Sequence, residues 1–324
     1  MQSGRICGNF SWYYSMNDTS TERSISPRHA VCGVCGCAQL LELFWSDDKN
    51  QRTTDERFLI ARCSSCNVVQ TVPQPPEETI SQYYPSIYYP NPMFAKRYYE
   101  RVAGKFQRER LLRLSRYEGS GKLLDIGCGI GYFVKAAADH GFEAEGLELD
   151  ERMAAAAREL WNLPVQCGTL SSNTYPPSNF RVITLWQSLE HMHHPMEALE
   201  AVWRLLVPGG IVAIGVPNFS SVQSRVFRSK WYHLDVPRHL FHYTPQSLTV
   251  VAERVGFTTI GVQFFSSEHN WAGILGSMIR LSPPGESLAH KAFRKLVGAP
   301  IARAVASIES GLGWGGTFEL VARK

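Results

Sequence analysis

The chain has 324 residues, of which 44% are hydrophobic and 19% are charged, and its formal net charge is +4. This composition is typical of a globular protein with a sizeable core, and the length allows one large α/β domain with a small appendage. The charge excess is too small to favour a nucleic-acid partner, and no apolar run reaches the roughly 20 residues that cross a bilayer. Because the N-terminus also lacks the apolar core of a signal peptide, we expect a cytoplasmic protein whose eight cysteines are thiols or metal ligands rather than disulfides.

The N-terminal region divides into a tail and a cysteine-rich module. Residues 1–28 are polar and aperiodic, which predicts a disordered tail. Residues 29–72 contain short strand-like runs and two C-x2-C pairs, formed by Cys32, Cys35, Cys63 and Cys66. Each such turn presents two sulfurs to one point, and four thiolates form a closed tetrahedral site for structural zinc. We predict a small zinc-binding module in which the metal supports folding only. A redox or metal-free role is the alternative, and Cys37 is a substitute ligand.

Residues 73–121 form a connector rich in proline and tyrosine, followed by a lead-in helix near 94–117. The tyrosines of the connector either fold over the bound molecules as a lid or pack the cysteine module onto the next domain. We favour Tyr88 and Tyr89 for a role in substrate binding.

From Lys122 onward, strands and helices alternate, which predicts a largely parallel sheet with crossover helices. The expected strands are Leu123–Ile126, Ala144–Leu149, Val165–Cys167, Val182–Leu185, Ile211–Val216, Thr258–Phe265 and Thr317–Ala322. The expected helices are Tyr132–His140, Arg152–Leu160, Pro195–Leu206 and Pro245–Val255.

A glycine loop follows the first of these strands. Gly127, Gly129 and Gly131 lack a Cβ, so that the backbone there can turn tightly and approach a ligand closely. Glu148 ends the next strand about twenty residues later, where a carboxylate can bind both ribose hydroxyls. Tyr132 occupies the position of the last glycine of the dinucleotide pattern, which favours a nucleoside without a pyrophosphate. The alternative is a glycine turn that binds no ligand.

Four segments, LLDIGCGIGYF, GLELD, ITLWQSLEHMHHP and RLLVPGG, resemble the successive motifs of class I S-adenosylmethionine-dependent methyltransferases. The resemblance covers roughly Lys122 to Lys324. It implies a Rossmann-like, mostly parallel seven-stranded sheet with strand order 3-2-1-4-5-7-6 and the last strand antiparallel. It also implies S-adenosylmethionine as cofactor, with the methionine part at the glycine loop and the ribose at Glu148. The cofactor residues implied are Asp125, Gly127, Gly129, Gly131, Glu148, Leu149 and Gln187.

A Glu-His pair follows the fourth strand, at the carboxyl edge where open α/β sheets bind their ligands. Methyl transfer to a hydroxyl or to an acidic carbon requires a base, and histidine is the most common choice. We predict His191 as the base, with Glu190 orienting or charging it. The alternative is that both residues only brace the loop and the following helix.

The segment near 217–245 is expected to form a cap over this edge. Its aromatic, acidic and basic side chains suit a small polar acceptor, and the planar guanidinium of Arg238 suits a phosphate or carboxylate. The expected substrate-binding residues of the cap are Trp231, His233, Arg238 and His242, and His239 is the second candidate base. The alternative is that these residues hold the crossover against the sheet.

Residues near 266–315 are expected to form a helical insertion with apolar residues at helical spacing. Packing on the protein itself is the favoured interpretation, and contact with a second copy in a homodimer or with a membrane surface is the alternative.

A cysteine module ahead of such a domain resembles sugar C-methyltransferases that act on nucleotide sugars, and also one type of ribosomal RNA methyltransferase. We therefore expect methyl transfer to an oxygen or carbon of a small polar acceptor, such as a sugar or a natural-product intermediate. The alternatives are an RNA methyltransferase whose module grips RNA, and a non-catalytic interaction protein stabilised by zinc.

Overall fold

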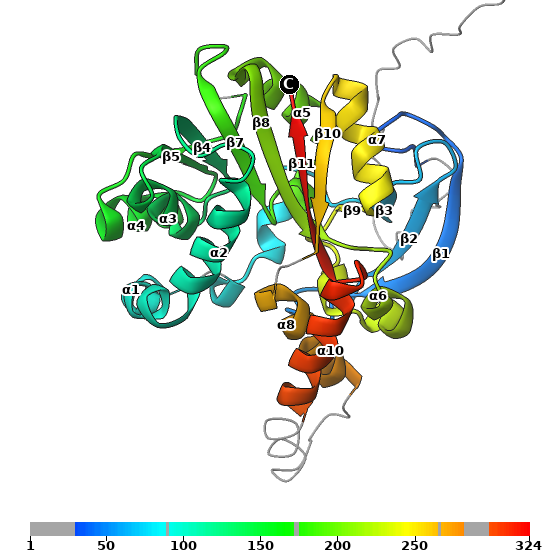
Figure 1. Cartoon of the computed structure of the whole chain (residues 1–324). Coiled ribbons are helices and arrows are strands. Elements are labelled where there is room, and N and C mark those ends of the chain that lie inside the picture. Colours follow the sequence, from blue (N-terminus) through cyan, green and yellow to red (C-terminus); the bar gives the residue numbers. More distant parts are fainter. Residues whose placement is uncertain (1–29, 89–90, 172–174, 265–266, 282–297) are drawn as a thin grey trace, which may run out of the picture.

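The computed structural model describes residues 30–88, 91–171, 175–264, 267–281 and 298–324. The predicted tail at 1–28 and Tyr89 lie outside the described residues. The described chain contains two β-sheets, one of seven strands and one of four. Figure 1 shows strands of the larger sheet side by side, with the blue N-terminal module next to helix α7 (Pro245–Val255).

The larger sheet begins at the predicted first strand. Its members are β4 (Lys122–Ile126), β5 (Glu143–Glu148), β6 (Val165–Cys167), β7 (Phe180–Trp186), β8 (Leu206–Pro217), β10 (Thr258–Gln263) and β11 (Thr317–Arg323). They lie in the order β6-β5-β4-β7-β8-β11-β10, and β11 runs antiparallel to both of its neighbours. Numbered in chain order from β4, these strands have the order 3-2-1-4-5-7-6 that the family resemblance implies. The structure thus has the Rossmann-like architecture predicted from the sequence.

Helices cover both faces of this sheet. They are α2 (Gly104–Leu114), α3 (Tyr132–Asp139), α4 (Glu151–Trp161), α5 (Pro195–Leu205) and α7 (Pro245–Val255). Successive strand residues point to opposite faces, so Leu123 joins a core cluster with α2 and α3, whereas Leu124 joins one with α5 and α7. The helix ends follow local capping rules. The Asp150 side chain accepts from two backbone N–H groups at the start of α4, and Gly256 ends α7 with φ +109°.

Most predicted boundaries shift by one or two residues, and two elements differ more. The predicted lead-in helix is interrupted. It consists of α1 (Pro92–Tyr98) and α2, with the π-helical segment η4 (Tyr99–Ala103) between them. β8 begins at Leu206, five residues before the predicted start, because the VPGG segment continues the strand instead of forming a loop.

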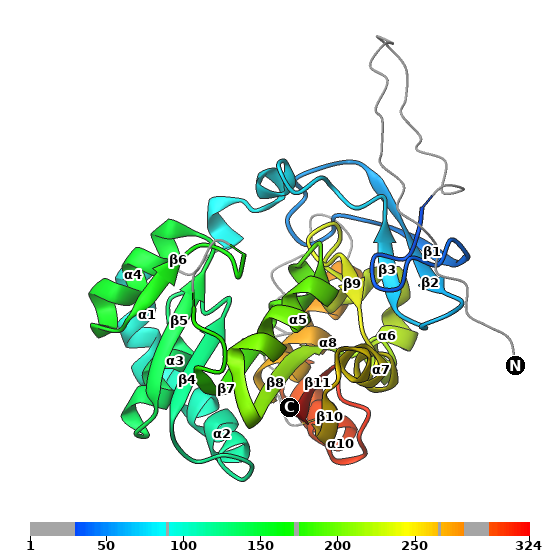
Figure 2. The same ribbon diagram turned by 90° about the horizontal axis from the view of Figure 1, so that it is seen from above.

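The smaller sheet joins the cysteine module to the cap. Its order is β1 (Leu40–Asp47), β2 (Arg57–Cys63), β3 (Val69–Val72) and β9 (Phe241–His242). β9 belongs to the cap segment and pairs antiparallel with β3, with Val69 opposite His242. Figure 2 shows β9 beside β3 from above. The module and the cap, which were expected as separate units, are therefore one continuous structure.

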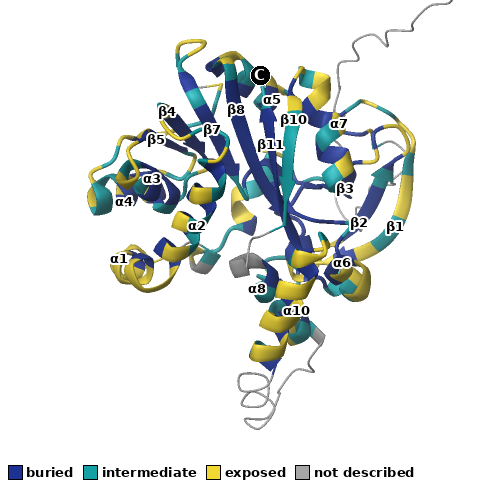
Figure 3. Cartoon of the chain, viewed as in Figure 1, coloured by how far each residue is buried: buried dark blue, intermediate teal, exposed yellow. Residues whose placement is uncertain are grey.

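The remaining cap and insertion elements lie at the end of the sheet where β8 ends. They are α6 (Val222–Phe227), η6 (Arg228–Lys230), η7 (Tyr232–Leu234), α8 (Ser267–Leu281) and α10 (Ala299–Gly311). α8 and α10 pack through Trp271, Ile274, Met278, Ala302 and Ala306. Fully buried Asn270 accepts from both the N–H and the hydroxyl of Thr317 at the start of β11. Figure 3 shows β8 and β11 buried at the centre of the larger sheet, whereas β10 at its edge is partly exposed.

No helix within the described residues combines the length and the apolar character that spanning a membrane requires.

Candidate active site

The glycine loop connects β4 to α3 in a backbone conformation that favours glycine. Gly127, Gly129 and Gly131 have φ values of +72°, +55° and +76°, which side chains with a Cβ rarely adopt. A Cβ on Gly127 would lie only 2.7 Å from the Cβ of Ser188, whereas a Cβ on Gly129 would meet open space. The loop is thus packed against the end of β7 on one side and open on the other.

Two carboxylates flank this loop. Asp125 is buried at the end of β4 and accepts a hydrogen bond of 2.6 Å from the Thr184 hydroxyl. Burial raises the pKa of Asp125 to about 7. Glu148 accepts from the backbone N–H of Gly129 at 2.7 Å and from that of Asp150 at 2.9 Å. Glu148 therefore holds the loop, and each of its oxygens keeps a second lone pair for a ligand. Leu149, the next residue, is 68% exposed.

The end of β7 leads directly to the Glu-His pair. The N–H of Gln187 donates to the carbonyl of Gly215 in β8. The positive φ of Gln187, +54°, then turns the chain out of the sheet. The Ser188 hydroxyl then donates to the carbonyl of Ile126 at 3.0 Å. The short helix η5 (Leu189–His191) follows at once. The Glu-His pair is thus fixed beside the glycine loop.

Two groups fix the ring of His191. Its Nδ1 lies 3.1 Å from the backbone carbonyl oxygen of Arg238 and 2.9 Å from the hydroxyl of Tyr84. A carbonyl only accepts, so Nδ1 carries the proton and Nε2 keeps its lone pair. Desolvation by the surrounding protein lowers the pKa of His191 to about 4. The ring is therefore neutral at pH 7.

Glu190 does not contact His191 in the predicted way. Its side chain is fully buried, and within the described part of the chain neither carboxyl oxygen has a hydrogen-bond partner. Burial raises the pKa of Glu190 to about 8. The groups that orient His191 are instead Tyr84 and the Arg238 carbonyl.

His239 completes a cluster with this pair. Its ring lies edge-on to that of His191, with 4.6 Å between the centroids, and its Nδ1 is 2.9 Å from the carbonyl oxygen of His233. Burial holds the pKa of His239 well below its usual range. One ligand atom from each of Glu190, His191 and His239 lies within 4.8 Å of the other two.

Arg238 has a different role from the predicted one. Its guanidinium is fully buried and pairs with Asp48 of the cysteine module at 2.6 Å and with Asp235 at 2.8 Å. Further bonds go to the carbonyls of Tyr83 and Val236. Since its donors are taken by the protein, Arg238 joins the module to the cap and does not hold an anionic acceptor.

Three other residues expected to bind substrate are also buried within the protein. Trp231 is completely buried in a cluster with Phe58 and Ile60 of β2. His233 is buried with its ring edge-on to Trp231, and His242 contacts the Thr71 hydroxyl in β3 at 3.1 Å. Sequence alone indicated polar and aromatic side chains here, but not that Trp231 and His242 pack against strands of the module.

The connector does reach the site. Tyr84 contacts His191 and packs edge-on against Tyr88, whose ring centroid lies 5.9 Å from the guanidinium carbon of Arg238. The sequence placed the tyrosines near the site but favoured Tyr88 and Tyr89 over Tyr84. Only the fold shows which tyrosine meets the histidine, because 107 positions separate them.

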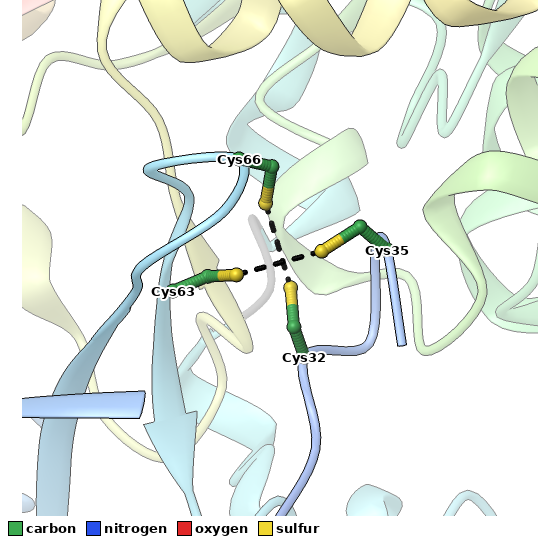
Figure 4. Close-up of side chains that lie close together, drawn as sticks. All are labelled: Cys32, Cys35, Cys63 and Cys66. Carbon is green, nitrogen blue, oxygen red and sulfur yellow. Dashed lines mark hydrogen bonds between the residues drawn. The ribbon is translucent and has the colours of Figure 1, made fainter. Parts of the chain in front are cut away.

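The four cysteines of the two pairs converge on one point, as Figure 4 shows. The Sγ atoms of Cys32 and Cys66 are 3.6 Å apart, and those of Cys35 and Cys63 are 3.4 Å apart. Sulfurs about 2.3 Å from a tetrahedral zinc ion would be about 3.8 Å apart. The arrangement therefore fits a four-thiolate metal site. Cys37 lies outside the cluster and contacts Ser64 instead.

Residues 95–262, about half of the chain, match the family described as "Methyltransferase domain". A ubiquinone biosynthesis O-methyltransferase from Coxiella burnetii is 27% identical over 129 residues, which are 38% of this chain and 53% of that protein. One from Thiobacillus denitrificans is 30% identical over 150 residues, which are 43% of this chain and 65% of that protein. The chain thus spans about half the length of the first of these relatives and somewhat more of the second.

Among solved structures, a SAM-dependent methyltransferase from Archaeoglobus fulgidus is similar with a TM-score of 0.46 and 21% identity, covering 70% of this chain and 100% of that one.

Proposed function

Because the chain belongs to the methyltransferase domain family, we propose that it transfers a methyl group from S-adenosylmethionine to a hydroxyl oxygen of a small molecule. The acceptor class is a hydroxylated metabolite such as a sugar or a natural-product intermediate. The printed names of the relatives, which are O-methyltransferases, favour oxygen over carbon. The observation that carries the proposal is the lone pair on Nε2 of His191, fixed beside the glycine loop by Ser188.

The donor site fits this cofactor. When bound, S-adenosylmethionine supplies a methyl carbon made electrophilic by the positive sulfur. Gly129 leaves the open side of the loop free for close approach of a ligand, and Glu148 has lone pairs for two ribose hydroxyls. Burial raises the pKa of the Asp125 carboxyl, and the charge of Arg110 offsets only part of this rise. An ammonium group beside Asp125 would stabilise the carboxylate further.

The acceptor site supplies the base. In the metal-free protein, Nε2 of His191 takes the proton of the acceptor hydroxyl as the oxygen attacks the methyl carbon. The C–O bond forms, the C–S bond breaks, and its electron pair goes to sulfur. Tyr84 and the Arg238 carbonyl hold the ring in one tautomer, which places the lone pair on Nε2 before the substrate binds.

We also propose that the four cysteines hold one structural zinc ion. Cys32, Cys63 and Cys66 are buried in the same core cluster as residues of α5 and α7. A closed four-thiolate site leaves no position for a substrate, so the ion would contribute to folding and not to the reaction.

Transfer of a labelled methyl group tests the proposed function. Purified protein is incubated with labelled S-adenosylmethionine and with nucleotide sugars, a catechol, or total RNA. Label in an O-methyl group of a small molecule, abolished by His191→Ala and retained by His194→Ala, is the expected result. His194 is the matched control because its side chain is 64% exposed. Label confined to RNA, or full transfer by His191→Ala, would refute the proposal.

A further inference from the structure

Glu190, His191 and His239 form a cluster that the fold leaves chemically incomplete. Their ligand atoms lie within 4.8 Å of one another, and the two carboxyl oxygens of fully buried Glu190 have no partner among the described residues. A buried carboxyl group without a hydrogen bond is costly, and native structures rarely keep one without a function. One carboxyl group and two imidazoles are groups that bind cations, so the cluster suits a positively charged ligand.

The backbone brings the three residues together from two segments. The N–H of Leu240 donates to the carbonyl of Glu190 at 2.8 Å, and His191 bonds to the carbonyl of Arg238. His239 lies in the chain between Arg238 and Leu240, which make these two contacts. On its other side, the Thr71 hydroxyl donates to the His239 carbonyl at 2.7 Å. The peptide of His239 is therefore held by both the η5 loop and the cysteine module.

Both imidazoles are oriented as metal ligands usually are. The Nδ1 of His191 faces the carbonyl of Arg238, and the Nδ1 of His239 faces the carbonyl of His233. A donated Nδ1–H fixes the tautomer that leaves Nε2 bare, which is the common arrangement around a coordinated histidine. The Nε2 of His239 lies 4.0 Å from the Asp235 carboxylate, which is too far for a hydrogen bond between them.

We propose that Glu190, His191 and His239 bind a divalent transition-metal ion that holds the acceptor hydroxyl. Two imidazoles and one carboxylate favour Mn²⁺, Fe²⁺, Co²⁺ or Zn²⁺ over Mg²⁺, which prefers oxygen ligands and keeps its waters. Three protein ligands leave at least one position open for a substrate oxygen. This site is separate from the four cysteines.

The role of the ion rests on the proposed methyl transfer, whereas its binding does not. An acceptor oxygen bound to the ion loses its proton to solvent water, because a divalent cation lowers the pKa of a bound hydroxyl. The resulting oxygen anion then attacks the methyl carbon, and the C–S electron pair goes to sulfur. His191 thus acts as a ligand in the metal-loaded protein and takes the proton only in the metal-free one.

Manganese binding tests the inference without any acceptor. The full chain is prepared with its cysteine site filled by zinc, and Mn²⁺ is then titrated while electron paramagnetic resonance measures the free ion. Manganese discriminates between the sites because it favours oxygen and nitrogen ligands over thiolates. We expect one further equivalent of bound metal, with spin-echo modulation from imidazole nitrogen. The modulation is measured on the wild-type protein, so this test does not require any variant to fold.

Variants then assign the ligands. Glu190→Gln and His239→Gln should each weaken Mn²⁺ binding by at least about tenfold. Even substitution of a residue that only hydrogen-bonds to a metal ligand lowers metal affinity by about that factor. His194→Gln, three positions from His191, should bind like the wild type. The absence of a further equivalent, a signal without imidazole coupling, or variants that bind like the wild type would overturn the inference. Metal binding without any methyl transfer would support the inference and refute the proposed function.

Discussion

Asp48 of the cysteine module and Arg238 of the cap form a fully buried ion pair across 190 positions of sequence. The same Arg238 residue offers its backbone carbonyl to Nδ1 of His191. Arg238 therefore connects the module to the candidate site. The module binds the side chain of Arg238, and the carbonyl of Arg238 orients His191. This relationship gives the cysteine module a structural role beside the methyltransferase domain, because the module fixes one side of the candidate site.

Breaking this pair should destabilise the whole chain. Asp48→Asn leaves the Arg238 guanidinium paired only with Asp235, and removing one partner of a buried pair costs about 3–5 kcal/mol. Asp47→Asn, at the neighbouring half-exposed aspartate, should change the free energy of unfolding by less than about 1 kcal/mol. Denaturant titration measures both variants. Equal changes in the free energy of unfolding of the two variants would show that the buried ion pair contributes no more stability than the exposed aspartate.

The sequence predicted the parallel sheet well because each strand is signalled locally, by an apolar run between turns. It did not predict β9 or the pairing of β9 with β3. β9 has only two residues, and its partner lies about 170 positions away. Local patterns report that a segment is buried but not what buries it.

The same limit explains the outcome for the site residues. Gly127, Glu148 and His191 belong to motifs with fixed spacing, so their neighbourhood was predictable. Arg238 and Trp231 are of the residue types that also bind polar substrates, and only the folded chain shows that the module buries both. Tyr84 was one of several similar tyrosines, and a single hydrogen bond to His191 distinguishes it.

Tyr84→Phe should slow catalysis without unfolding the protein. The change removes the hydroxyl oxygen that accepts from Nδ1–H of His191, which costs about 1 kcal/mol, or roughly a fivefold loss in kcat. Tyr83→Phe is the matched control, because the Tyr83 hydroxyl contacts Glu56 and not the site. Steady-state kinetics with the identified acceptor measures the effect. A kcat of Tyr84→Phe equal to that of the wild type would mean that the hydroxyl does not orient the ring.

Gly127→Ala should abolish cofactor binding. The new methyl group would lie 2.7 Å from the Cβ of Ser188 at a φ of +72°, so that the loop must move away from the end of β7. Gly141→Ala has a similar positive φ of +103° with open space around it, and should lose stability but keep the affinity. Calorimetry with S-adenosylhomocysteine compares the two. Unchanged affinity in Gly127→Ala would place the cofactor elsewhere.

The buried carboxyl group of Asp125 should make stability depend on pH. Its folded pKa of about 7 lies above its ordinary value of 3.8, so the folded state holds a proton that the unfolded state releases. This contribution is complete below pH 3.8 and is lost as the pH rises through 7. Between pH 5 and 8, the free energy of unfolding should fall by roughly 3 kcal/mol relative to Asp125→Asn. Parallel pH profiles of the two proteins would disprove the raised pKa of Asp125.

Removing metal from the cysteine site should destabilise the methyltransferase domain as well as the module. Cys32, Cys63 and Cys66 share a core cluster with Leu248 and Val251 of α7, so loosening the thiolates also loosens that face of the large sheet. Loss of a tightly bound ion removes about 4 kcal/mol, which corresponds to a melting temperature about 10 °C lower. Calorimetry before and after chelation should therefore show one transition that shifts as a whole. Cys63→Ser should melt like the chelated protein, whereas Cys167→Ser, at an exposed cysteine outside the cluster, should melt like the wild type. A separate low-temperature transition, with the main one unmoved, would show that the module folds independently and that the shared core does not couple it to the domain.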